Sequence, residues 1–341
     1  MGKQSMTAGT STKRTRVGAM AAAVAVAALG AGAAASSGAE RPVAEPQTGA
    51  TAPTAAEVRA ATQRFLAGTA KADIPAPSGG GIATAAARRR SILPQRRVVS
   101  FYGAPQLSQT IVGRYGPAQA GKRLRKQANA YKGAKRRPVT AAFDLIGVIA
   151  TADRGSDGKY RTRQSPQIIN TYLARARKLN ARLMLDIQPG RANVLGELKA
   201  LRRWAVEPDV DLAIDPEWNV GRKGVPGRTS GSITAKRVNR FSLKLQKLIA
   251  RRGLPPKILA LHQFHSRSVR KPKRIRDRRD IDIVLNFDGI GGPKAKAAGY
   301  ANLSTKRLNN GFSLFYSRDE PVMKPRAVLR LEPEPDFLLY Q

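Results

Sequence analysis

The sequence predicts an α/β fold, and within that class a closed (β/α)8 barrel of the TIM type. Apolar strand-like runs alternate with basic helix-like segments along residues 98–341, which is the pattern of β/α units and a parallel sheet. Eight such units in about 245 residues match the size of a closed barrel. Polar residues also recur where the strands end, and a barrel builds its site at that end. A doubly wound open sheet with fewer strands is the alternative.

The expected strands are short runs rich in β-branched, aromatic and other apolar residues. In chain order they are 98–102, 139–146, 182–188, 210–217, 257–263, 282–288, 312–316 and 327–332. Helices are expected where apolar residues recur at three- and four-residue spacing among Lys and Arg, at 118–131, 165–179, 193–206, 234–252 and 267–279. The two-residue period of a strand places Asp144 with Ala142, Asp186 with Met184, and Asn286 with Val284. We expect these faces to point inward, because the opposite faces are apolar and can pack on the helices.

Two segments precede the predicted barrel domain. Residues 1–35 have a cationic start and an Ala/Val-rich run that closes on Ala33 and Ala35, the layout of a signal peptide with an A-x-A cleavage site. An uncleaved membrane anchor is the alternative. Residues 36–97 are rich in Ala, Pro, Gly and Ser and predict a disordered linker, interrupted by one short helix near 55–66. The barrel domain is then 98–341.

The charge balance predicts an anionic partner or environment. Lys and Arg number 61 against 23 Asp and Glu, a net charge of +38. Basic runs at 122–137 and 267–279 indicate an anionic cell-wall polymer, or only a solvated basic surface. Nucleic acid is not expected as a physiological partner, because the chain is predicted to be exported and few aromatic residues interleave the runs. Membrane contact is expected only with an uncleaved leader, and the protein is expected to be a monomer.

Cysteine is absent from the chain. Its absence excludes disulfides, a thiol mechanism and a lipid-modified cysteine after the leader. Export without disulfides favours a bacterial cell envelope, so we expect an extracellular or cell-wall location.

The strongest indication of chemistry is the carboxylate pair at the end of the fourth strand. The period-two rule places Asp211, Ala213, Asp215 and Glu217 on one strand face. Two neighbouring acids can divide into an ionised group and a raised-pKa acid, which glycosidic cleavage needs. We therefore expect Glu217 to be the general acid/base and Asp215 its partner; a structural ion pair is the alternative.

Other polar residues at strand ends are expected to shape a substrate site in the barrel mouth. They are Tyr102, Asp144, Asp186, Gln188, Trp218, His262, Asn286, Asp288 and Tyr316. Trp218 is placed to stack on a sugar ring or to serve as ordinary packing. Glu332 ends the eighth predicted strand. A metal bound by His262 with nearby acids is conceivable, but no metal motif is present, so neither a metal nor a cofactor is expected.

Asp215-x-Glu217-Trp218 resembles the end of the Asp-x-x-Asp-x-Asp-x-Glu signature of family 18 glycoside hydrolases, the chitinase-like enzymes. The resemblance implies that Glu217 is the general acid and that Asp215 orients the acetamido group of the substrate. Val210 and Ala213 stand where that signature has Asp.

A second resemblance spans most of 97–341. The motifs FYGAP (101–105), LDIQPGR (185–191), DPEW (215–218) and HQF (262–264) are similar to those of a family of secreted bacterial (β/α)-barrel proteins of uncharacterised function. Together these features predict an exported glycoside-hydrolase-like protein that acts on cell-wall or environmental glycan. The alternative is a noncatalytic domain that binds cell-envelope polyanions on an enzyme-like barrel.

Overall fold

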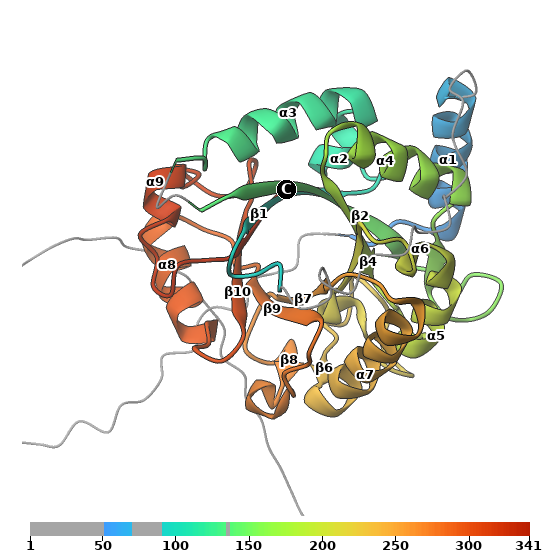
Figure 1. Cartoon of the computed structure of the whole chain (residues 1–341). Coiled ribbons are helices and arrows are strands. Elements are labelled where there is room, and N and C mark those ends of the chain that lie inside the picture. Colours follow the sequence, from blue (N-terminus) through green and yellow to red (C-terminus); the bar gives the residue numbers. More distant parts are fainter. Residues whose placement is uncertain (1–50, 70–90, 134–136) are drawn as a thin grey trace, which may run out of the picture. The chain divides into compact units, whose positions relative to one another are not determined.

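The computed structural model describes residues 51–69, 91–133 and 137–341, and within them eight parallel strands close into a barrel (Figure 1). The strands are β1 (Arg97–Gly103), β2 (Val139–Ala150), β4 (Arg182–Ile187), β5 (Val210–Ile214), β7 (Lys257–Gln263), β9 (Ile281–Phe287), β10 (Asn309–Leu314) and β11 (Phe337–Tyr340). The sheet closes because β1 pairs with β2 on one side and with β11 on the other. The predicted (β/α)8 barrel is therefore confirmed.

Helices surround this barrel and connect its strands. They are α1 (Ala55–Thr69), α2 (Ile111–Arg114), α3 (Pro117–Asn129), α4 (Pro166–Lys178), α5 (Val194–Ala200), α6 (Arg202–Ala205), α7 (Ala235–Arg252), α8 (Pro293–Leu303) and α9 (Pro325–Val328). Short elements fill the loops: β3 (Arg161–Arg163), β6 (Ile233–Thr234), β8 (Val269–Arg270) and the 3-10 turns η3 (Pro216–Trp218) and η4 (Pro272–Arg274). The four predicted helices at 118–131, 165–179, 193–206 and 234–252 correspond to α3, α4, the pair α5 and α6, and α7.

The helix predicted at 267–279 is wrong. This segment contains the strand β8, which pairs with β6, and then the turn η4. Pro272 removes a backbone donor and disfavours helical geometry in the residue before it. Lys271, the residue before Pro272, takes a left-handed conformation with φ of 59°, which no helix interior contains.

Two apolar layers separate along the two faces of the strands. The interior layer includes Ala142, Met184, Ala213, Val284 and Leu339. The residues that alternate with these along the same strands point outward and pack against the helices. They include Phe143, Leu145, Leu183, Leu185 and Ile283. The strand faces predicted from the two-residue period are thus confirmed, and they aim the intervening polar residues into the barrel.

The last two strands lie elsewhere than predicted. The eighth is Phe337–Tyr340 rather than 327–332, because Val328 and Leu331 are buried at helical spacing in the outer layer and belong to α9 and the following turn. Glu332 is exposed and precedes the strand instead of ending it. The seventh strand begins and ends earlier than predicted, at Asn309–Leu314, so Tyr316 falls in the loop after it.

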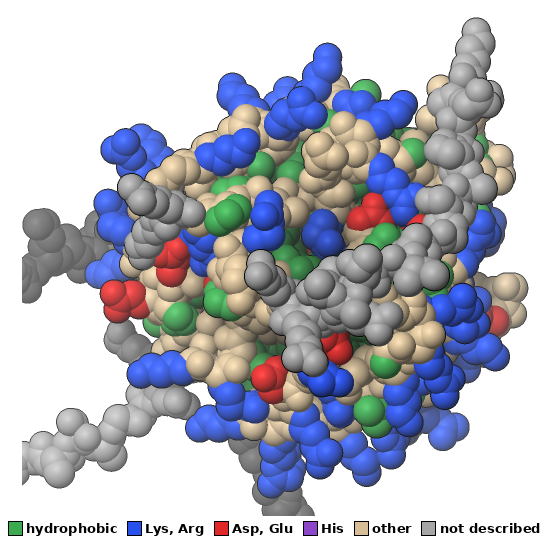
Figure 2. Space-filling model, in the orientation of Figure 1, with side chains coloured by type: hydrophobic (Ala, Val, Ile, Leu, Met, Phe, Trp, Pro, Cys, Tyr) green, Lys and Arg blue, Asp and Glu red, His purple; other side chains and the backbone are tan. Residues whose placement is uncertain are grey.

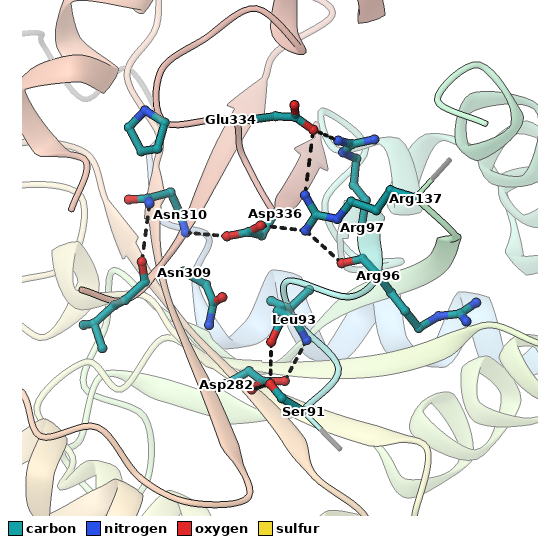
Figure 3. A network of polar contacts seen from close by, with 12 residues as sticks. Ser91, Leu93, Arg96, Arg97, Arg137, Asp282, Asn309, Asn310, Glu334 and Asp336 are labelled. Carbon is teal, nitrogen blue, oxygen red and sulfur yellow. Dashed lines mark hydrogen bonds and ion pairs between the residues drawn. The ribbon is translucent and has the colours of Figure 1, made fainter. Parts of the chain in front are cut away.

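A polar network closes the amino-terminal end of the barrel beneath the interior core (Figure 3). Asp282, at the start of β9, accepts hydrogen bonds from the backbone N–H groups of Ile92 and Leu93 at 2.7 and 2.9 Å and from the Ser91 hydroxyl. This carboxylate therefore holds the segment before β1 across the bottom of the barrel.

Two arginines extend the same network to the segment before β11. The fully buried Arg97 pairs with Glu334, and Arg137 pairs with Asp336 at 2.6 Å. Asp336 also accepts from the backbone N–H of Asn310 at 3.3 Å. The bottom of the barrel is thus stabilised by ion pairs, which leaves the polar residues at the opposite strand ends for other roles.

The predicted leader, 1–35, and much of the predicted linker lie outside the described residues. Within the linker, α1 covers the short helix expected near 55–66, and it contacts the barrel: Ala55 N donates to Asp153 Oδ1 at 2.6 Å, and Gln106 Nε2 donates to Thr62 Oγ1 at 2.8 Å. Among the described residues, no helix combines the length and the apolar character needed to cross a bilayer.

Candidate active site

A cavity of about 400 Å³ opens at the carboxyl ends of the barrel strands. Its wall includes seven of the residues that the sequence predicted for the site: Tyr102, Gln188, Asp215, Glu217, Trp218, His262 and Asp288. They come from β1, β7 and the segments that directly follow β4, β5 and β9, so the closure of the barrel brings together groups far apart in sequence. Phe264, Ile290 and Phe315 supply apolar surface around them.

Glu217 lies in the turn η3 rather than on the strand where the sequence placed it. β5 ends at Ile214, because Pro216 has no N–H to continue the ladder. The turn is fixed by its backbone, and the Gly231 N–H donates to the Glu217 carbonyl at 2.5 Å. Glu217 lines the cavity, and its buried Oε2 has no hydrogen-bond partner among the described residues.

The other acids of the fourth strand divide between the two ends of the barrel. Asp215 is buried and reaches the cavity wall. Asp211 lies at the amino-terminal end, where it pairs with Arg182 at 2.7 Å and accepts from the Ile258 N–H at 2.8 Å. Asp211 is therefore a structural group, whereas Asp215 belongs to the cavity.

Tyr102 links the carboxylates of two neighbouring strands. Its hydroxyl lies 3.3 Å from Asp186 Oδ2 and 3.5 Å from Asp215 Oδ2, and it accepts a hydrogen bond from Gln188 Nε2 at 2.9 Å. Gln188 is fixed in turn by the Ala150 N–H, which donates to its Oε1 at 3.0 Å. The phenol therefore has its acceptor position filled and one proton to donate to either acid.

His262 and Asp288 form the wall contributed by β7 and the end of β9. His262 Nδ1 lies 2.7 Å from Asp288 Oδ2. Asn286 Nδ2 donates to Asp288 Oδ1 at 2.6 Å, and the Ser313 hydroxyl bonds to the same oxygen. These contacts fix both the carboxylate and the imidazole ring.

Two further carboxyls, Asp144 and Asp186, lie beneath the cavity. Both side chains are fully buried, and Asp144 Oδ1, Asp144 Oδ2 and Asp186 Oδ1 have no hydrogen-bond partner among the described residues. His262 Nε2 lies 3.8 Å from Asp144 and 3.9 Å from Asp186, beyond hydrogen-bond distance. Asn286 is also fully buried, and none of these three predicted residues lines the cavity.

Burial and mutual repulsion raise the pKa values of the acids in this cluster. Burial, followed by the charge of Asp288, raises the pKa of Glu217 to about 7. Burial raises the pKa of Asp186 to about 6. Burial together with a neighbouring carboxylate also raises the pKa values of Asp144 and Asp215 well above their usual range. Near neutral pH the cluster therefore holds protons that it can donate.

The imidazole is the basic member of the cluster. Burial alone lowers the pKa of His262, but the hydrogen-bonded Asp288, with Asp186 and Asp215, raises it well above its ordinary value. The cavity thus combines an imidazole held by Asp288 with carboxyl groups whose pKa values are raised, a set suited to acid/base catalysis.

The structure places Tyr316 apart from this cavity. Its side chain is 43% exposed, stacks on Tyr340 with ring centroids 5.3 Å apart, and donates to Gln127 at 3.0 Å. Because β10 ends at Leu314, the inward-facing residue near the end of the seventh strand is Ser313.

Two features of the site were missed from the sequence. Ser313 lies within the predicted seventh strand, but that strand was expected to end at Tyr316, so the inward-facing residue was placed on the wrong parity. Arg318, in the loop after β10, lines the cavity, and its charge opposes the rise in the pKa of Glu217. That loop is anchored by a buried pair, in which Lys296 Nζ donates to Asp319 Oδ2 at 2.6 Å.

The conceivable metal site around His262 is not supported by the arrangement of donors. Within residues 51–69, 91–133 and 137–341, no group of three or more His, Asp or Glu side chains could hold a metal ion. His265 lies in the loop after β7, where its Nε2 lies 3.0 Å from the Ser230 hydroxyl. The two histidines therefore do not meet.

In comparisons with known proteins, no protein-family model and no curated protein matches the sequence.

Proposed function

We propose that the protein is a glycoside hydrolase that cleaves a glycan in the mouth of its barrel, with Glu217 as the general acid/base. One observation carries this proposal: Glu217 lines the cavity, its pKa is raised to about 7, and its buried Oε2 has no hydrogen-bond partner among the described residues. Glycosidic cleavage needs a carboxylic acid that is still protonated near neutral pH beside a second carboxyl group. Asp215, two residues earlier on the same cavity wall, supplies that second group.

The remaining side chains of the wall have roles that follow from their chemistry. Trp218 offers an aromatic face to a sugar ring, and Tyr102, Gln188 and Asp288 offer hydrogen bonds to its hydroxyl groups. The short likeness to family 18 enzymes supports the same assignment, with Glu217 as acid and Asp215 as the group that orients the substrate.

We propose further that the substrate is a cell-wall or environmental glycan encountered outside the cytoplasm, by a monomeric protein. The support is the signal-peptide layout of residues 1–35 and the absence of cysteine.

The experiment is an assay of the full chain for release of reducing ends from peptidoglycan, chitin-type and β-glucan substrates. We expect activity on at least one of them, and we expect Glu217→Gln to lower kcat about 10²- to 10⁴-fold. Glu332→Gln is the matched control, because Glu332 is exposed at the amino-terminal side of β11. The wild-type pH profile should fall as pH rises through about 7, because the acid then loses its proton.

Two results would count against hydrolysis. The first is the absence of product from all three glycans with folded protein, and the second is equal activity of the Glu217→Gln and wild-type proteins. If glycans bind without cleavage and Glu217→Gln abolishes that binding, the barrel is a noncatalytic glycan-binding domain.

A further inference from the structure

A second concave surface lies outside the barrel, between α7 and the segment from β8 to Arg278. Its volume is about 940 Å³, compared with about 400 Å³ for the cavity in the mouth. In Figure 2, Lys and Arg side chains gather along the lower edge of the molecule, over the part where Figure 1 places α7 and β8. We call this surface the α7 groove.

Among the residues that the structure describes, the α7 groove is lined by cations and by no carboxylate. Six exposed basic side chains lie along it: Lys236, Arg240, Arg270, Lys271, Arg274 and Arg276. The half-buried Arg278 adds a seventh. None of the seven forms an ion pair with another described residue, unlike Arg97, Arg177 or Arg182, each of which faces an acid elsewhere in the fold. The groove therefore concentrates uncompensated positive charge in a concave surface, where it is strongest.

The two walls of the groove are tied together by Asn239 of α7. Asn239 Nδ2 donates to the Arg274 carbonyl at 2.9 Å, and its Oδ1 accepts from the Arg276 N–H at 2.8 Å. Arg278 donates to the Asn239 carbonyl at 3.2 Å. A single side chain thus fixes the spacing of the cations on both walls, which lowers the entropy that binding must overcome.

From these observations we infer that the α7 groove binds a linear polymer of repeated phosphate groups. A guanidinium group can bind two phosphate oxygens at once, and several such groups in one groove can each contact a phosphate of the same polymer. A concave surface fits a single strand better than a flat bilayer. In the described part of the chain, no aromatic side chain lines the groove to stack on a base, which disfavours nucleic acid. The 39% exposed Leu243 can contact a carbon backbone.

The test compares two variants of the full chain that carry the same net charge. The groove variant replaces two Lys and two Arg by Gln: Lys236, Arg240, Lys271 and Arg274. The control variant makes the same replacement on α4, α5 and α6, at exposed positions outside the groove: Lys178, Lys199, Arg202 and Arg203. Thermal unfolding monitored by circular dichroism establishes that both variants are folded.

Binding of long-chain inorganic polyphosphate and of single-stranded DNA of equal charge is measured from 50 to 300 mM NaCl. For polyphosphate at 100 mM NaCl, we expect the groove variant to lose about 10- to 100-fold in affinity, with a shallower salt dependence, and the control to lose less than about 3-fold.

Equal losses of affinity in the two variants would overturn the proposal, since the net charge alone would then explain binding. A groove that prefers the DNA would overturn the choice of partner. Hydrolysis of a short neutral glycan should be unchanged in the groove variant, so this result stands apart from the proposed catalysis.

Discussion

Replacing Glu217 by Gln should stabilise the protein at alkaline pH and change its stability little in acid. In the folded protein, burial and then the charge of Asp288 raise the pKa of Glu217 from 4.5 to about 7. The folded state therefore binds this proton more tightly than the unfolded chain does. The stabilisation by the bound proton is complete below pH 4.5 and is lost as pH rises through about 7. Gln keeps the neutral shape and cannot ionise.

The magnitude follows from the difference between the two pKa values. At pH 8, where the wild-type carboxyl is ionised, the free energy of unfolding of Glu217→Gln should exceed that of the wild type by about 3 kcal/mol. At pH 5 the excess should be below about 1 kcal/mol, because the folded wild type is still protonated there.

The assay is urea unfolding followed by far-UV circular dichroism at both pH values. Glu332→Gln, at an exposed position, should match the wild type at each pH. A Glu217→Gln variant that gains nothing between pH 5 and pH 8, or that is less stable than the wild type at pH 8, would refute the reasoning, because the carboxyl would then be solvated or paired in solution.

Two further predictions concern the cavity wall and the bottom of the barrel. Asp288→Asn should lower the pKa of His262, because it removes the carboxylate that lies 2.7 Å from Nδ1; an NMR titration of the imidazole measures this, and an unchanged pKa would contradict the assigned pairing. Asp282→Ala should lower the free energy of unfolding by about 3 kcal/mol, because the segment before β1 loses three hydrogen bonds to a carboxylate. A loss below about 1 kcal/mol by chemical denaturation would show that this carboxylate does not hold the segment.

The barrel could be predicted because its strands alternate polar and apolar residues in a regular way. Strand β4 shows the reason: Leu183 and Leu185 are buried in the outer layer, and Met184 is buried in the interior. One face of each strand packs on the helices and the other faces the interior of the closed barrel. Whether a residue stands at an odd or an even position in the strand therefore decides which of the two layers its side chain joins. Asp186 has the parity of Met184, so the sequence also predicts that this carboxyl group points into the barrel, where it is fully buried.

Failures occurred where local sequence supports two conformations equally. The apolar residues at 327–331 fit a strand, but burial in the outer layer selects the helix α9 and moves the eighth strand to Phe337–Tyr340. Pro272 breaks a segment whose spacing of apolar residues is helical. The seventh strand was predicted to end at Tyr316, whereas β10 ends at Leu314 and Ser313 is the residue that faces inward near its end.

The sequence by itself determined that the chain forms a (β/α)8 barrel, which side chains face its interior, and that Asp215 and Glu217 stand at the end of the fourth strand. Only the tertiary structure decided what surrounds these acids, because that depends on strands distant in the chain. It put Asp288 near Glu217, placed Tyr102 between two carboxylates, and brought the cations of α7 opposite those of β8 and the segment after it. Charges and hydrogen bonds act through space over a few ångströms, so the chemistry of the site depends on closure of the barrel and not on order along the chain.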